Sequence, residues 1–219
     1  MTAKVDFKKD YKDLYLPKTK PMLIDVPQMQ FIMVDGAGDP NSEAYQQAIG
    51  ILYGLTFTIK MSKMSGQQPP GYYEYVVPPL EGLWWVSGGG FSFDQRENWL
   101  WTSMIRQPEF VTPAVFDWAV KECGRKKPEL DLARARFSSF TEGLCVQIMH
   151  IGPYSDEPRS VELMKAFMTE NSLIDETGSE RKHHEIYLSD PRKTASEKLK
   201  TVLRHPVARG GRDQKNLDQ

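Results

Sequence analysis

Hydrophobic and polar positions follow the same order twice along the chain. The first stretch, VPQMQFIMVDGAGDPNSEAYQQAIGILYGL, has an apolar strand-like run, a glycine turn, and then apolar residues at helical spacing. The second stretch, FTEGLCVQIMHIGPYSDEPRSVELMKAF, repeats that order. Short apolar runs between turn residues are typical of strands, and a spacing of three or four residues is typical of an amphipathic helix. The pattern therefore predicts two copies of one structural unit.

Both copies also end in similar strands. WTSMIRQP, ending at Pro108, matches LKTVLRHP, ending at Pro206. Because proline has no N–H for a sheet ladder, each strand is expected to stop at its Arg-x-Pro step. Each half then has the order β-α-β-β, at about residues 22–110 and about 134–207, with an additional strand at about 134–140 and a joining helix at about 113–124.

These elements predict an α+β fold made of duplicated βαββ units. Their antiparallel sheets are expected to pair about a pseudo-two-fold axis, within one domain at residues 1–207. The polar stretch at residues 208–219 is expected to be a disordered tail. A cleft between the two halves is a natural ligand site, because it collects side chains from both copies.

Composition limits the classes of partner. The chain has 28 basic and 29 acidic side chains, whereas a nucleic-acid-binding protein usually shows a basic surplus or stripe. No apolar run approaches the ~20 residues needed to span a membrane, and the charged N-terminus does not resemble a signal peptide. Cys123 and Cys145 lie in apolar segments, which favours buried thiols in a reducing compartment. We expect a cytoplasmic protein, a monomer or weak dimer, with neither nucleic acid nor membrane as a partner.

The most informative segment is KHHEIYLSDPRK. As a strand it would place His183, Glu185 and Tyr187 on one face and His184, Ile186 and Leu188 on the other. One interpretation is a solvent-facing edge strand with Glu185 exposed. The other is a carboxylate that projects into an aromatic cleft, where burial would raise its pKa and let it act as a base or a counter-charge.

The first half offers two possible counterparts of Glu185. Alignment with PPLEGLWWV pairs it with Glu81, and a competing register through YYEYVV pairs it with Glu74. We favour Glu81, because it keeps the carboxylate closer to the matching Arg-x-Pro strand. Parity with Glu81 then directs Trp85 to the cleft and leaves Trp84 to meet the helices.

Tryptophans are dense in this half. Five lie between Trp84 and Trp118, and Trp99 and Trp101 share one face of a predicted strand. Core packing accounts for any single one of them. As a group, they indicate an aromatic wall suited to flat, polycyclic or cationic ligands.

Metal and cofactor signals are weak. His183 and Glu185 could supply two metal ligands, but the spacing of the other histidines places no third, so no metal is expected. The segment GAGDPN has two of the glycines of a dinucleotide fingerprint and lacks the rest, so it is interpreted as a turn. No cofactor is expected.

Four motifs in order, DGAGDPN, PPLEGLWW, MHIGPYSDE and HHEIYLSDPRK, are followed by SEKLKTVLRHPV. Together they resemble the stand-alone GyrI-like small-molecule-binding proteins over about residues 17–207. The resemblance implies a SOUL-type duplicated fold, in which a buried glutamate of the last repeat faces aromatic ligands; Glu185 matches that residue. The motif set is also similar to that of a subfamily of hydrolases, which open the strained cyclopropane of DNA-alkylating cyclopropyl-pyrroloindole toxins in an aromatic cage.

Three functions follow from this interpretation. As a hydrolase, the protein would use Glu185 to orient or deprotonate water, and Tyr187 or Tyr154 to donate a hydrogen bond to the carbonyl that gains charge. The ligand-binding residues would be Trp84, Trp85, Trp101, Glu81, Tyr154 and His183, around a small aromatic ligand. Alternatively, the same site would bind and sequester hydrophobic or cationic drugs without altering them. A protein-interaction role ranks last, since no partner surface is evident.

Overall fold

The computed structural model describes residues 4–88 and 96–210. Its strands are β1 (Met22–Val26), β2 (Met29–Ala37), β3 (Leu80–Val86), β4 (Trp99–Arg106), β5 (Ala135–Phe140), β6 (Gly143–Ile151), β7 (Leu173–Asp175), β8 (His183–Tyr187) and β9 (Lys200–Arg209). Its α-helices are α1 (Phe7–Asp10), α2 (Lys12–Tyr15), α3 (Glu43–Lys60), α4 (Pro113–Lys126) and α5 (Glu157–Glu170). Short 3-10 turns are η1 (Met61–Ser65), η2 (Arg96–Asn98), η3 (Leu132–Arg134), η4 (Tyr154–Asp156) and η5 (Ser196–Lys198).

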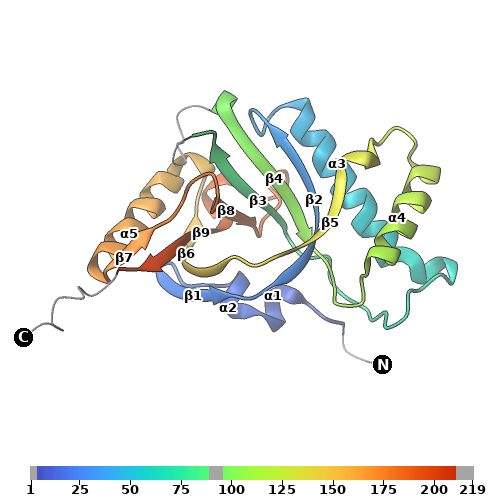
Figure 1. Cartoon of the computed structure of the whole chain (residues 1–219), viewed down its shortest axis with the longest axis horizontal. Helices are drawn as coiled ribbons and strands as arrows, with labels where there is room; N and C mark the ends of the chain where they lie inside the picture. The colour runs from blue at the N-terminus through green and yellow to red at the C-terminus, as the bar shows by residue number, and fades with distance from the viewer. Residues whose placement is uncertain (1–3, 89–95, 211–219) are drawn as a thin grey trace, which may run out of the picture.

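The strands form one antiparallel sheet in the order β1-β6-β9-β8-β3-β4-β2-β5, with β7 paired to β9. The order is symmetric about the central β8–β3 pair: β3-β4-β2 on one side corresponds to β8-β9-β6 on the other. The predicted α+β fold with duplicated βαββ units is therefore confirmed. In Figure 1, α5 and β7 lie at one end of the molecule and α3 and α4 at the other.

We call β2, α3, β3 and β4 the first half, and β6, α5, β8 and β9 the second half. The predicted additional strand is β5, and the predicted joining helix is α4, which begins at Pro113 after the capping residue Thr112. Strand β9 differs from the expectation because it does not stop at Pro206. The carbonyl of Pro206 accepts a 3.0 Å hydrogen bond from the Glu176 N–H, and Val207–Arg209 pair with β7. The strand thus runs two residues into the expected tail; residues 211–219 lie outside the described part of the chain.

Strand alternation divides the side chains between two faces of the sheet. Helix α3 packs on β2 and β4, and α5 packs on β6. The register places both helices on the face that carries Trp101, Glu185 and Leu203. The short helices α1 and α2 lie on the other face, where the Leu14 carbonyl accepts a 2.9 Å hydrogen bond from Arg204 Nη2. The face under α3 and α5 holds the candidate site.

Candidate functional site

Glu185 lies on a central strand, between β9 and β3, and is 6% exposed. Its Oε1 lies 3.0 Å from His183 Nε2, and its Oε2 accepts a 2.7 Å hydrogen bond from the Tyr187 hydroxyl. These contacts confirm that His183, Glu185 and Tyr187 share one face of their strand. The alternative of a solvent-facing edge strand is excluded by the position of β8 in the sheet.

The expected positions of Glu81 and Trp85 need correction. Gly82, not Glu81, lies opposite Glu185, and Glu81 lies opposite Ile186 on the other face of the sheet. Glu81 is buried there, within 3.0 Å of His184 Nε2 and 3.3 Å of the Tyr15 hydroxyl. A shift of one residue moves every side chain of a strand to the opposite face. Trp84 therefore joins Glu185, and Trp85 does not.

Trp85 and Glu74, which the sequence analysis considered as neighbours of Glu185, lie away from it. Trp85 is half-buried on the face of Glu81, where the Lys182 ammonium lies 4.5 Å from its ring centroid. Glu74, the alternative counterpart, lies outside the named strands and pairs with Lys63 at 2.6 Å. Neither residue contacts Glu185 in the described part of the chain.

Aromatic side chains surround the Glu185 carboxylate. Trp84 Nε1 donates a 3.1 Å hydrogen bond to the Tyr187 hydroxyl, which in turn donates to Glu185. The ring of Tyr45, from α3, packs at 5.5 Å from Trp84 and 4.9 Å from Trp101, between centroids. Tyr154, from η4, meets Tyr187 edge-on at 6.0 Å. Trp84 and Trp101, two of the residues expected to form an aromatic wall, share their face with Glu185, and their contact with a ligand stays a prediction.

Gly82 makes room for this arrangement. A Cβ at this position would lie 2.7 Å from Trp84 Nε1 and 3.2 Å from the Tyr187 oxygen. The hydrogen bond between Trp84 and Tyr187 therefore passes directly over a residue that has no side chain.

Glu157 is the residue that the sequence did not reveal. It is the first residue of α5, it is 2% exposed, and its Oε1 has no hydrogen-bond partner among the described residues. Burial, followed by the charge of Glu185, raises the pKa of Glu157 well above its usual value, although Thr201 and Arg96 oppose the shift. The start of a helix normally favours an ionised carboxylate. Here, burial and the repulsion of Glu185 outweigh the helix dipole.

The tyrosines of the site keep their protons at neutral pH. Burial, with contributions from Glu157 and Glu185, raises the pKa of Tyr154 to about 12. Burial and the charge of Glu185 likewise raise the pKa of Tyr45 to about 12, against a hydrogen bond with Ser103. The site thus combines two acidic side chains with hydroxyl groups that can only donate or accept hydrogen bonds.

The two halves contribute different chemistry. The first half supplies Tyr45, Trp84 and Trp101, and the second half supplies all the acidic and imidazole groups that meet at the site.

An open pocket of about 630 Å³, lined by residues that include Trp85, Lys182 and Arg136, lies on the opposite face and does not include Glu185. Within residues 4–88 and 96–210, no group of three or more His, Cys, Asp or Glu side chains is arranged to hold a metal ion. None of the helices in those ranges is both long and apolar enough to cross a membrane.

A buried carboxylate pair within an aromatic wall, at the junction of duplicated halves, is the kind of site found in small-molecule-binding proteins. Residues 19–208 match the family model of the GyrI-like small molecule binding domain, and the chain belongs to this family. No curated protein matches the chain.

Solved structures agree with this assignment. An uncharacterized conserved protein from Listeria innocua is 53% identical, with a TM-score of 0.91, over 94% of this chain and 100% of that chain. A hydrolase from Listeria innocua is 51% identical, with a TM-score of 0.87 and the same coverage. The EcmrR C-terminal domain is 12% identical, with a TM-score of 0.53 over 87% of this chain and 98% of that chain, and shares the fold alone.

Proposed function

We propose that the protein hydrolyses electrophilic, DNA-alkylating aromatic compounds by opening a cyclopropane ring with water. The observation that carries this proposal is the buried pair of Glu157 and Glu185, in which burial and the neighbouring charge raise the pKa of Glu157. The aromatic wall of Tyr45, Trp84 and Trp101 would stack a flat ligand against this pair. The 51% identical relative from Listeria innocua, described as a hydrolase, supports the reaction class.

The pair suits an addition of water that needs both a base and an acid. Glu185 would take a proton from water, whose oxygen bonds to the cyclopropane methylene carbon. The carbon–carbon bond that breaks releases its electron pair through the conjugated ring to a carbonyl oxygen, and Glu157 would protonate that oxygen. Glu185 then carries a proton taken from water, and Glu157 is ionised. The starting state returns when Glu185 has lost that proton and Glu157 has gained one.

The tyrosines have separate roles in this scheme. The Tyr187 hydroxyl already donates to Glu185 Oε2 and accepts from Trp84, so it would position the base. Tyr154 lies near both carboxylates and keeps its proton, and we assign it the hydrogen bond to the carbonyl oxygen as charge develops.

The test is turnover of a cyclopropyl-pyrroloindole alkylator, with the ring-opened alcohol measured by mass spectrometry. Glu157→Gln and Glu185→Gln should each lower the rate by about a hundredfold or more, because each removes a proton-transfer group. Quenching of tryptophan fluorescence by the ligand should show that both variants still bind it. Glu162→Gln, an exposed residue of the same helix α5, serves as the control. Equal turnover by Glu185→Gln and the parent would contradict the assigned mechanism.

The second candidate function is sequestration without chemistry. The observation in its favour is the same aromatic wall beside a buried acidic group, which would hold a flat cation by stacking and charge. Recovery of unmodified ligand after saturating binding, with no alcohol formed, would establish sequestration in place of hydrolysis.

A further inference from the structure

A line of hydrogen-bonded side chains connects Glu185 to an edge of the sheet. Glu185 Oε1 lies 3.0 Å from His183 Nε2, and His183 Nδ1 lies 2.8 Å from His205 Nε2. His205 Nδ1 in turn lies 3.2 Å from Asp175 Oδ2. The four residues come from the neighbouring strands β8, β9 and β7. Each bond joins ring nitrogens or carboxylate oxygens, all of which can gain or lose a proton.

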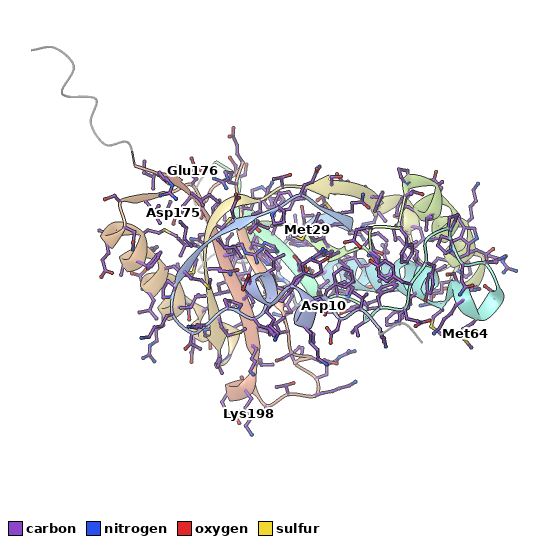
Figure 2. All side chains as sticks on the ribbon, turned by 90° about the horizontal axis from the view of Figure 1, so that it is seen from below. Asp10, Met29, Met64, Asp175, Glu176 and Lys198 are labelled. Atoms are coloured by element: carbon purple, nitrogen blue, oxygen red, sulfur yellow. The ribbon has the colours of Figure 1, made fainter. Side chains whose placement is uncertain are left out.

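Only the outer end of this line is open to water. His183 and His205 are buried, at 0% and 3% exposed, and Glu185 is nearly so. The side chain of Asp175 is 32% exposed. Figure 2 shows Asp175 next to Glu176 at one end of the molecule. The buried carboxylate pair is therefore linked by titratable groups to a solvent-exposed acid.

We propose that Glu185 exchanges its proton with solvent through His183, His205 and Asp175. This path rests on the proposed function for its purpose, which is to remove from Glu185 the proton that it takes from water in each reaction. Its geometry is a property of the protein without ligand.

Counting protons shows that the path works in both directions. When Glu185 is protonated and Asp175 is ionised, both imidazoles are neutral, and each carries its proton on Nδ1. Three protons then shift along the three hydrogen bonds toward Asp175. Glu185 becomes ionised, both imidazoles carry their proton on Nε2, and Asp175 holds the proton that it gives to water. Uptake of a proton at Asp175 reverses every step, and the heavy atoms need not move.

The surroundings of the line favour this exchange. Burial and the charge of His205 lower the pKa of His183, although the hydrogen bond to Glu185 opposes this shift. Burial would raise the pKa of Asp175, but the hydrogen bond from His205 and, when that ring is protonated, its charge lower the pKa to about 2, so Asp175 is ionised at neutral pH, as the first state of the path requires. Other ionisable groups face the inner end of the line: Tyr45 from α3, Tyr154 from η4, Glu157 from α5, and Tyr187 from β8. His184, on the opposite face of the sheet, acts on His183 through its charge.

The first test needs no substrate. The chain has four histidines, so the nitrogen chemical shifts of each imidazole can be followed by NMR while the side-chain carboxyl carbon of Glu185 is titrated. We expect His183 and His205 to change from the Nδ1–H to the Nε2–H tautomer at the pH at which Glu185 ionises. Glu185→Gln should abolish both changes. His184, which faces a carboxylate at each ring nitrogen, should keep both protons and is the internal reference. A single tautomer of His183 throughout the titration of Glu185 would overturn the proposal.

The second test separates conduction from structure. His205→Gln keeps a side chain that can hydrogen-bond but cannot pass a proton, and Asp175→Asn removes the outlet. Each should lower turnover of the cyclopropane probe by about tenfold, less than the loss on removing a direct acid–base group, and imidazole buffer should restore the rate. Glu176→Gln, which alters the adjacent acid that pairs with Arg181, should have neither effect.

The outcomes of the two tests are distinct. Loss of turnover without rescue by imidazole would assign His205 and Asp175 a structural role and overturn the path. If the parent protein shows no turnover at all, the proposed function fails, and the tautomers of His183 and His205 still decide the proton path.

Discussion

Glu142 joins two buried cations on the face of the sheet opposite the candidate site. Its Oε2 lies 3.0 Å from His184 Nδ1 and 2.8 Å from Arg204 Nη1. Burial alone would raise the pKa of Glu142, but the charges of His184 and Arg204 lower it to about 2. Burial would lower the pKa of His184, but Glu142 raises it to about 9. All three groups are therefore charged at neutral pH, and each depends on the others.

Glu142→Gln should be among the most destabilising single substitutions in this protein. It leaves two buried cations without their common carboxylate, and breaking a buried ion pair in this way costs about 3–5 kcal/mol. The free energy of unfolding from urea titration measures the loss. Glu122→Gln, which removes a surface ion pair with Arg125, should change it by less than about 1 kcal/mol. If Glu142→Gln lowered the free energy of unfolding by no more than Glu122→Gln does, the network would not hold the fold together.

The same network predicts how stability depends on pH. The folded-state pKa of His184, about 9, is above its unfolded value, so its contribution is complete below about pH 6.5 and is lost as pH rises through 9. The folded-state pKa of Glu142, about 2, is below its unfolded value, so its contribution is lost as pH falls from about 4.5 through 2. Urea unfolding over this range should show a decline on the alkaline side that His184→Gln largely removes. An alkaline decline of equal size in that variant would exclude His184 as its cause.

At the scale of single elements, strand β3 decides which tryptophan serves the site. Trp84 and Trp85 are adjacent in sequence, yet they lie on opposite faces and contact Tyr187 and Lys182, respectively. The strand and its alternation could be predicted from the sequence. The register could not, because a shift by one residue leaves the hydrophobic pattern almost unchanged when both faces of a strand are buried.

Trp84→Phe tests this register. Phenylalanine fills most of the same space but has no N–H, so Tyr187 loses the donor that fixes its hydroxyl toward Glu185. Turnover of the cyclopropane probe should fall by about tenfold, the effect of losing about 1–1.5 kcal/mol of hydrogen bonding. Trp85→Phe, on the other face, is the matched control and should keep the parent rate. The reverse order of effects would place the ligand on the face of Trp85.

The burial of Glu157 at the start of helix α5 could not be predicted from the local sequence pattern. Its sequence predicts an amphipathic helix with acidic residues in the first turn, and the helix starts at Glu157 as that pattern requires. An acidic residue at a helix start is normally exposed, so nothing in the sequence distinguishes Glu157 from Asp156. Its environment depends on Glu185 of β8 and Thr201 of β9, residues that lie far from it in the chain.

For the whole molecule, the internal repeat was sufficient to predict the duplicated fold. Each half has the same order of strands and helix, and pairing the two sheets through β3 and β8 covers one edge of each. The covering of the second face was not predicted, because α1 and α2 are each only four residues long. Their place is set by tertiary contacts such as Phe7, which packs 4.7 Å from the Arg106 guanidinium.

Phe7→Ala should therefore destabilise the entire sheet and not only the N-terminus. Phe7 is 1% exposed and packs edge-on against Tyr75, so its loss leaves a cavity that costs about 3–5 kcal/mol. The midpoint of thermal unfolding measures the effect, with Lys8→Ala in the same short helix as the control. An unchanged midpoint would show that the N-terminal helices unfold independently of the sheet.

The split between an aromatic first half and an acidic second half has an evolutionary consequence. In a protein made of two identical repeats, one substitution would alter both sides of the site at once. Here, Trp101 and Tyr45 can diverge to accept ligands of new shape while Glu157, Glu185 and the histidines retain their proton chemistry; Trp84 is the exception, because its hydrogen bond to Tyr187 positions Glu185. Duplication has thus separated recognition from reactivity on a single sheet, and selection can adjust either one alone.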